Sequence, residues 1–83
     1  IGEERFIIET AFSLGHDYFS VGDNSESIKY FDMAKLFYEK NGVKHMMARV
    51  YNRLGAAYFE LEHYQEAEQF MKKDLSLHKD INF

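Results

Sequence analysis

Hydrophobic side chains recur along this 83-residue chain at alternating steps of three and four residues. This spacing places side chains on one face of an α-helix. Two such series stand out, and each predicts an amphipathic helix whose apolar stripe faces the core. The first series is Ile7, Ala11, Leu14, Tyr18 and Val21, and the second is Met47, Tyr51, Leu54, Tyr58 and Leu61.

The second series is the first one displaced by forty residues. The stretch Leu14-Gly15-x-x-Tyr18-Phe19 recurs as Leu54-Gly55-x-x-Tyr58-Phe59. Two unrelated helices would share apolar positions by chance, but they would not so easily share a mid-helix glycine beside leucine. Internal repetition with a period of roughly 20–50 residues is typical of helical repeat arrays. We therefore expect residues 1–83 to form one segment with two repeats, at about 3–42 and 43–82.

Turn signals divide each repeat into two helices. Gly22-Asp23 is followed by Glu26, as in a capping box at a helix start, and Asn41-Gly42 is a typical helix end. Proline is absent, and the β-branched alternation of strands is missing. An all-α fold follows, with helices predicted at 3–21, 24–41, 43–61 and 64–80.

The break near residue 62 has the weakest signal. Glu62 and His63 stand where the first repeat has Gly22 and Asp23. Judged on these residues alone, 43–80 could equally be one continuous helix of roughly 57 Å at 1.5 Å per residue.

The repeated pattern resembles the tetratricopeptide repeat family, in its longer form with about forty residues per repeat rather than 34. The residues that carry the resemblance are Leu14, Gly15, Tyr18, Ser27, Phe31 and Ala34 in the first repeat, and Leu54, Gly55, Tyr58, Ala67 and Met71 in the second. Asp74 departs from the pattern at the last small position. The resemblance implies two stacked antiparallel helix hairpins, a fragment of an α-solenoid. Bacterial receptors for short signalling peptides and adaptor scaffolds that bind G-protein-regulating motifs are equally similar subgroups.

Composition excludes several classes of protein. The net charge of −4 argues against sequence-independent nucleic-acid binding, and the absence of cysteine excludes disulfide scaffolds and thiolate chemistry. No apolar run approaches the roughly 18 residues of a membrane span. The four histidines form no i, i+4 pair, and neither a phosphate-binding loop nor a catalytic triad pattern is present. We expect a cytoplasmic module without enzyme activity, cofactor or metal.

The resemblance implies a groove lined by the first helix of each repeat. Asn52 carries both a donor and an acceptor for a peptide backbone, and Arg49 and Arg53 lie one helical turn apart, where they could clamp a carboxylate. The alternative is that both arginines are solvated charges paired with nearby acids. Phe12 and Phe19 either pack locally or offer an apolar pocket. The candidate peptide- or protein-binding residues are Phe12, His16, Phe19, Arg49, Asn52, Arg53 and Phe59.

Two functions are compatible with these features. The first is a scaffold, for example in signalling, that binds a peptide or protein in the groove. The second is an assembly segment that packs against sister repeats or self-associates. Apolar residues near both ends favour contacts with further repeats or with a second copy, including a helix-swapped dimer if 43–80 is continuous. They are Phe6, Ile7, Ile8, Ile81 and Phe83.

Overall fold

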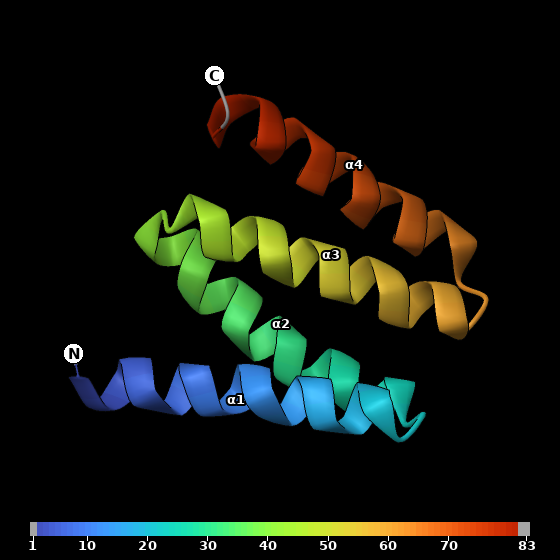
Figure 1. The fold of residues 1–83 in the computed structure, drawn as a ribbon, viewed down its shortest axis with the longest axis horizontal. Coiled ribbons are helices and arrows are strands. Elements are labelled where there is room, and N and C mark those ends of the chain that lie inside the picture. Colours follow the sequence, from blue (N-terminus) through green and yellow to red (C-terminus); the bar gives the residue numbers. More distant parts are fainter. Residues whose placement is uncertain (1, 82–83) are drawn as a thin grey trace.

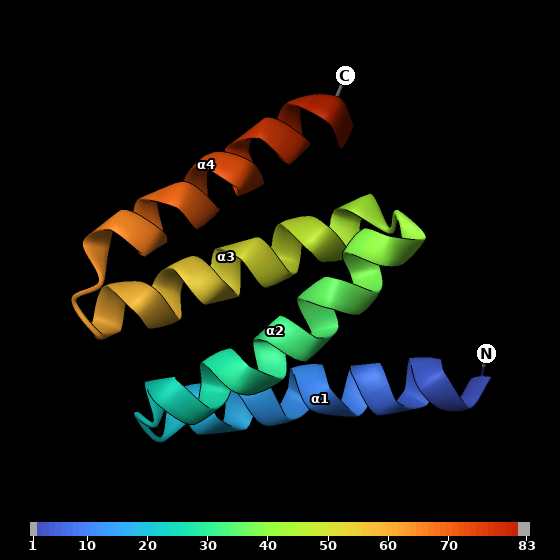
Figure 2. The ribbon, with the colours of Figure 1, turned by 180° about the vertical axis from the view of Figure 1, so that it is seen from behind.

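In the computed structural model, which describes residues 2–81, the chain forms four helices and two antiparallel hairpins (Figures 1 and 2). Each helix packs against the next along the chain, and the molecule is a flat body of 34 × 31 × 16 Å. The all-α fold with two stacked hairpins is confirmed. The helices are α1 (Gly2–Ser20), α2 (Asn24–Asn41), α3 (Lys44–Glu60) and α4 (Tyr64–Ile81).

The turns inside the two hairpins have the same backbone hydrogen bonds, displaced by forty residues. Asp23 N–H donates to the Tyr18 carbonyl at 2.9 Å, and His63 N–H donates to the Tyr58 carbonyl at 2.9 Å. Gly22 has φ +85°, in the left-handed region, and Glu62 adopts the same region with φ +63°. The second hairpin therefore breaks at 61–63 without a glycine, and residues 43–80 are two helices rather than one.

Glu62→Gly is expected to raise the free energy of unfolding by about 1 kcal/mol, because a side chain at positive φ is strained by roughly that amount. The matched control is Gly22→Ala, which introduces the same strain into the first hairpin and should lower the free energy of unfolding by a similar amount. Urea denaturation of both variants measures the two changes. Equal stability of Glu62→Gly and the natural chain would contradict the strain at this turn.

The core lies between α1, α2 and α3. Phe31, Ala34, Val50 and Leu54 are fully buried, and Ile8, Phe12 and Tyr38 complete the same cluster. A hydrogen bond of 2.5 Å from the Tyr51 hydroxyl to Glu39 Oε2 links α3 to α2 beside this core. The second hairpin has a thinner core, since among residues 64–80 of α4 only Ala67 is buried.

The predicted apolar stripe of the first helix is wrong at both of its ends. Ile7 is 56% exposed and Val21 is 78% exposed, whereas Ile8 and Phe12 are buried. The run Phe6-Ile7-Ile8 offers an apolar residue to more than one face, and the contacts with α2 and α3 select the face of Ile8. Val21 lies beyond the last residue of α1, in the turn.

Two glycines allow the close approach of the paired helices. A Cβ atom added at Gly15 would lie 2.6 Å from the Phe31 ring, and one added at Gly55 would lie 2.7 Å from Cε of Met71. Phe31 and Met71 are themselves forty residues apart. Both hairpins therefore use the same contact, with a rigid ring in the first and a flexible side chain in the second.

Within residues 2–81, none of the helices is long and apolar enough to cross a lipid bilayer. Phe83 lies outside the described residues, as does the side chain of Ile81, so the expectation for these two residues concerns a part of the chain that the structure does not describe.

Candidate functional site

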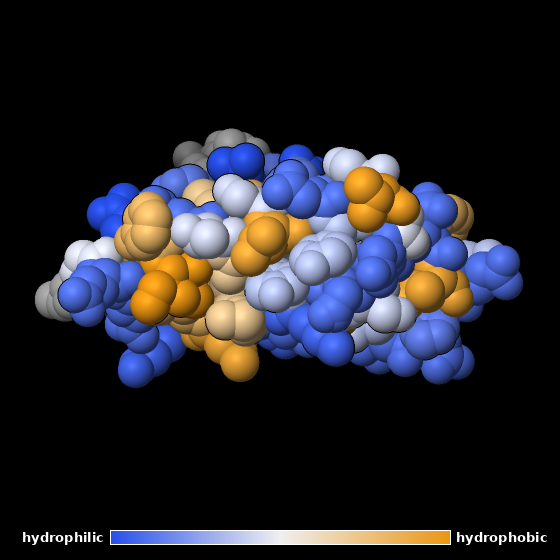
Figure 3. Space-filling view, turned by 90° about the horizontal axis from the view of Figure 1, so that it is seen from below, coloured by the Kyte–Doolittle hydropathy of each residue, from blue (hydrophilic) through white to orange (hydrophobic). Residues whose placement is uncertain are grey.

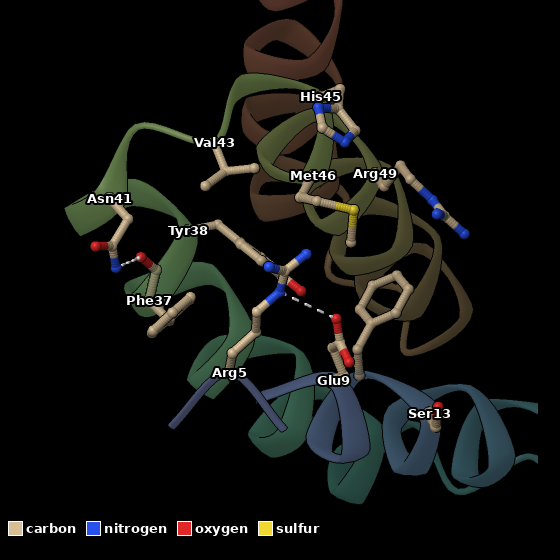
Figure 4. A pocket seen from close by; sticks show the side chains of 11 residues that line it. Arg5, Glu9, Ser13, Phe37, Tyr38, Asn41, Val43, His45, Met46 and Arg49 are labelled. Carbon is tan, nitrogen blue, oxygen red and sulfur yellow. Dashed lines mark hydrogen bonds and ion pairs between the residues drawn. The ribbon is translucent and has the colours of Figure 1, made fainter. Parts of the chain in front are cut away.

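Two hollows flank the first half of α3. The first, of about 560 Å³, lies between α1, the end of α2 and the start of α3 (Figure 4). The second, of about 400 Å³, lies between α3 and α4. His45 and Arg49 line both hollows, so the two form adjacent parts of one candidate site.

The first hollow combines apolar and charged groups. Phe12, Tyr38 and Met46 supply apolar surface from three different helices. At its edge Arg5 and Glu9 form an ion pair at 3.4 Å, drawn as a dashed line in Figure 4. The charges of Arg5 and Glu9 offset each other, so Arg49 supplies the positive charge that is available to a ligand in this hollow.

The second hollow contains a chain of polar contacts that connects three helices. Arg53 Nε donates to His16 Nε2 at 2.9 Å, and Arg53 Nη1 donates to Asn52 Oδ1 at 3.1 Å. Asn52 Nδ2 donates to Asp74 Oδ2 at 3.4 Å, and His78 Nε2 lies 3.0 Å from Asp74 Oδ1. The chain of contacts holds Asn52 and Arg53 in fixed orientations, which lowers the entropy cost of presenting them to a ligand.

The two arginines lack acidic partners. Among residues 2–81, no carboxylate lies within ion-pairing distance of Arg49 or Arg53, whereas the other groove arginine, Arg5, is paired. Arg49 is exposed, and its guanidinium lies 5.4 Å from the centroid of the Phe12 ring. The ion pairs that the alternative reading required are therefore not formed among residues 2–81, although Arg49 is exposed to solvent as that reading also expected.

His16 is held as a neutral imidazole. Its ring lies edge-on to Phe12 at 5.0 Å and to Phe31 at 5.7 Å, and its Nε2 accepts the hydrogen bond from Arg53. Burial, followed by the charges of Arg53 and Arg49, lowers the pKa of His16, against a smaller opposite effect of Asp17. A neutral Nε2 is required because only an unprotonated nitrogen accepts a hydrogen bond.

The lowered pKa of His16 predicts a loss of stability in acid. In the unfolded chain the His16 imidazole takes up a proton near pH 6.5, whereas in the folded chain it does so only at lower pH. The stability that the neutral imidazole contributes is therefore fully present above pH 6.5 and decreases as the pH falls below that value. The decrease in unfolding free energy between pH 7 and pH 5 should therefore be smaller in His16→Gln than in the natural chain. His63→Gln, at an exposed histidine, is the control and should keep the full decrease. Identical pH profiles for all three chains would contradict this role.

The structure brings together five of the seven predicted site residues. Phe12 and Arg49 line the first hollow, Arg49, Asn52 and Arg53 line the second, and His16 contacts Arg53. Phe12 is also a core residue, with 8% of its surface exposed.

The other two predicted residues lie apart from both hollows. Phe59 is 57% exposed and packs edge-on against Tyr64 at 5.4 Å, and Phe19 is half-buried near the end of α1. Both stand at the opposite end of the first helices from His45, at the turns within the hairpins.

Sequence reasoning missed three polar residues that line the second hollow, His45, Asp74 and His78. His45 lies in the first turn of α3, before the predicted groove positions. Asp74 and His78 lie on α4, whereas the resemblance directs attention to first helices only. One signal was present, since Asp74 is the residue that departs from the repeat pattern. Within the described residues, no three histidine or acidic side chains are grouped as metal ligands.

Comparison with known families agrees with the architecture. The tetratricopeptide repeat family matches residues 6–80. The chain belongs to this family. Proteins of the family mediate protein interactions, typically as scaffolds without enzyme activity. Neither the curated proteins nor the solved structures gave a match to the tetratricopeptide repeat chain.

Proposed function

We propose that this tetratricopeptide repeat segment binds a peptide or protein segment across the two hollows of α3. The supporting observation is the pair of arginines without acidic partners among residues 2–81, one helical turn apart, of which Arg49 lines both hollows and Arg53 lines the second. A carboxylate of the partner would bridge Arg49 and Arg53, because guanidinium groups hold carboxylates through charge-assisted hydrogen bonds. Asn52 would contact the partner's backbone beside them.

The proposal has three further parts. Residues 3–42 and 43–82 act as two repeats of one binding surface. The chain itself catalyses no reaction and needs no cofactor. It works in the cytoplasm, in signalling or assembly, and binds neither nucleic acid nor membrane.

Peptide selection tests the proposed site without a known partner. Random peptides with free C-terminal carboxylates, displayed on an array, are expected to yield binders enriched in acidic residues. Arg49→Gln, Arg53→Gln and Asn52→Ala should each weaken the selected peptides by about tenfold, which corresponds to the loss of one charged or bidentate contact. Fluorescence anisotropy measures the affinities, and circular dichroism checks that helicity is unchanged.

The matched control is Lys72→Gln, which removes an exposed positive charge on α4 outside both hollows. This variant should bind the selected peptides as the natural chain does. Equal weakening by Lys72→Gln would show that net charge alone drives binding. Selected peptides that bind all variants equally would place the site elsewhere.

A specific observation also favours the assembly function. Phe6 on α1 is 70% exposed and Leu75 on α4 is 62% exposed, at opposite sides of the stack. Phe6 and the neighbouring Ile7, which is 56% exposed, line one apolar hollow, and contiguous exposed apolar surface is typical of interaction surfaces. The view onto α1 in Figure 3 shows apolar surface gathered toward the N-terminal part of this helix. The groove and these outer faces are different surfaces, so both functions can coexist in one chain.

A further inference from the structure

We propose that Asn52 is a positioning residue that keeps Arg53 from forming an ion pair with Asp74, and so leaves the Arg53 guanidinium available to an acidic partner. Arg53 and Asp74 carry opposite charges and line the same hollow between α3 and α4. Among residues 2–81 no ion pair joins them, and each contacts Asn52 instead. This role rests on the proposed function, and it explains how one arginine of the site remains unpaired.

The amide of Asn52 lies between the two charged groups. Arg53 Nη1 donates to Oδ1 of Asn52 at 3.1 Å, and Nδ2 of Asn52 donates to Oδ2 of Asp74 at 3.4 Å. A guanidinium can only donate and a carboxylate can only accept, so the amide has a single orientation in which both contacts form. These contacts place Arg53 Nη1 and Asp74 Oδ2 no more than about 9 Å apart. Removal of the amide would leave two opposite charges facing each other across a short gap.

A second contact holds Arg53 toward α1. Its Nε donates to His16 Nε2 at 2.9 Å, whereas Asp74 lies on α4, at the other end of the stack of helices (Figures 1 and 2). The guanidinium has five N–H donors, of which the contacts with His16 and Asn52 use two. The remaining donors are available to a ligand as long as Arg53 stays in this position.

The polar residues at this place have apolar or small counterparts in the first hairpin. The positions forty residues earlier are occupied by Phe12, Ser13 and Ala34. Phe12 and Ala34 belong to the core cluster, so the first hairpin buries apolar surface where the second has an amide and a carboxylate. Asp74 therefore brings a charge close to the arginine that the repeat pattern does not require, and the amide separates the two.

The burial of Asp74 would favour an ion pair if the amide were absent. Its side chain is 13% exposed, and its Oδ1 is buried. Charges that are shielded from water attract each other more strongly than exposed ones, because solvent and salt screen them less. His78 Nε2 lies 3.0 Å from Oδ1, so Oδ2 is the oxygen that Arg53 would reach. A paired Arg53 would no longer be available to a carboxylate of the partner.

A double-mutant cycle with one acidic peptide from the array selection tests this role. Asn52→Ala should weaken binding of the peptide about tenfold in the natural chain, but only about twofold in the Asp74→Asn background, where a neutral side chain does not hold Arg53. Asp74→Asn keeps the size of the side chain and an acceptor for Asn52, so it removes the charge alone. Fluorescence anisotropy measures the four affinities, and circular dichroism shows that every variant is folded.

The matched control removes a carboxylate elsewhere on α4. Asp80→Asn neutralises an exposed side chain that lines neither hollow. In this background Asn52→Ala should keep its full effect on the affinity. If Asp80→Asn reduced the effect as much as Asp74→Asn does, net charge would explain the result and the proposed role of Asn52 would be overturned.

A titration of the ligand-free chain tests the same role without a peptide. The charge of Arg53 contributes, after burial, to the lowered pKa of His16. In Asn52→Ala, pairing with Asp74 would move this charge and offset it, so NMR should show the pKa of His16 closer to its ordinary value of 6.5. Adding Asp74→Asn to this variant should lower the pKa of His16 again.

The other charged residues that act on His16 are Arg49 and Asp17, and none of the variants changes them. The proposed role is overturned if the pKa of His16 is the same in Asn52→Ala as in the natural chain. It is also overturned if Asn52→Ala causes an equal loss of affinity with and without Asp74→Asn, since Asn52 would then act on the partner alone. If no peptide is selected, the proposed function fails, whereas the titration still decides whether Asn52 separates the two charges.

Discussion

Phe31→Ala is expected to lower the free energy of unfolding by about 3–5 kcal/mol, because it deletes a buried ring and leaves a cavity. Phe31 has no exposed surface, and its ring packs against Phe12 at 5.6 Å and His16 at 5.7 Å. A domain of this size has a total stability of about 4–12 kcal/mol, at roughly 0.05–0.15 kcal/mol per residue. The variant should therefore be largely unfolded or denature at much lower urea concentration, as followed by far-ultraviolet circular dichroism.

The internal repeat supplies the control for this experiment. Met71 occupies the position of Phe31 in the second hairpin, but it is 39% exposed. Met71→Ala removes less buried surface and leaves a site open to water, so a loss of about 1 kcal/mol is expected. If the two variants lose equal free energies of unfolding, the difference in burial between Phe31 and Met71 does not determine the cost of these substitutions.

Gly15→Ala is expected to destabilise the chain by about 1–2 kcal/mol, although alanine is the better helix former by about 1 kcal/mol. The added Cβ would lie 2.6 Å from Cε1 and 2.7 Å from Cδ1 of Phe31. This ring is enclosed on all sides and cannot move without displacing α2 from α1. The strain of overpacking therefore exceeds the gain in helix propensity, and thermal denaturation should show a lower midpoint.

Gly55→Ala is the matched substitution in the second hairpin and should have the opposite sign. Its Cβ would meet Cε of Met71 at 2.7 Å, and this atom is the end of a flexible, partly exposed side chain. Met71 can change rotamer at small cost, so the propensity gain of about 1 kcal/mol is retained. Destabilisation by Gly55→Ala as large as that by Gly15→Ala would contradict this account.

The candidate site was only partly predictable from the sequence. Arg49, Asn52 and Arg53 were predicted because the resemblance to tetratricopeptide repeats implies a groove along the first helix of each repeat, and these residues lie off the apolar stripe of that helix. The hydrogen bond from Arg53 to His16 joins residues 37 positions apart, and the one from Asn52 to Asp74 joins residues 22 apart. Such pairings depend on how the helices are stacked, which no local pattern specifies. For the same reason the sequence did not indicate that His78 lines the second hollow, or that Phe59 lies away from both hollows.

The sequence by itself determined the all-α character, the first hairpin and the repeat of forty residues, because helix spacing, caps and turn glycines act over only a few residues. The tertiary structure decided which side of α1 is buried, since Phe6-Ile7-Ile8 offers apolar side chains in several directions and only contact with α2 and α3 selects Ile8. It also decided the turn at Glu62, where a left-handed residue without glycine is held by the packing of α4 on α3. Helices, caps and turns depend on residues that are close in the sequence, whereas burial and polar contacts between side chains depend on segments that are far apart in the sequence.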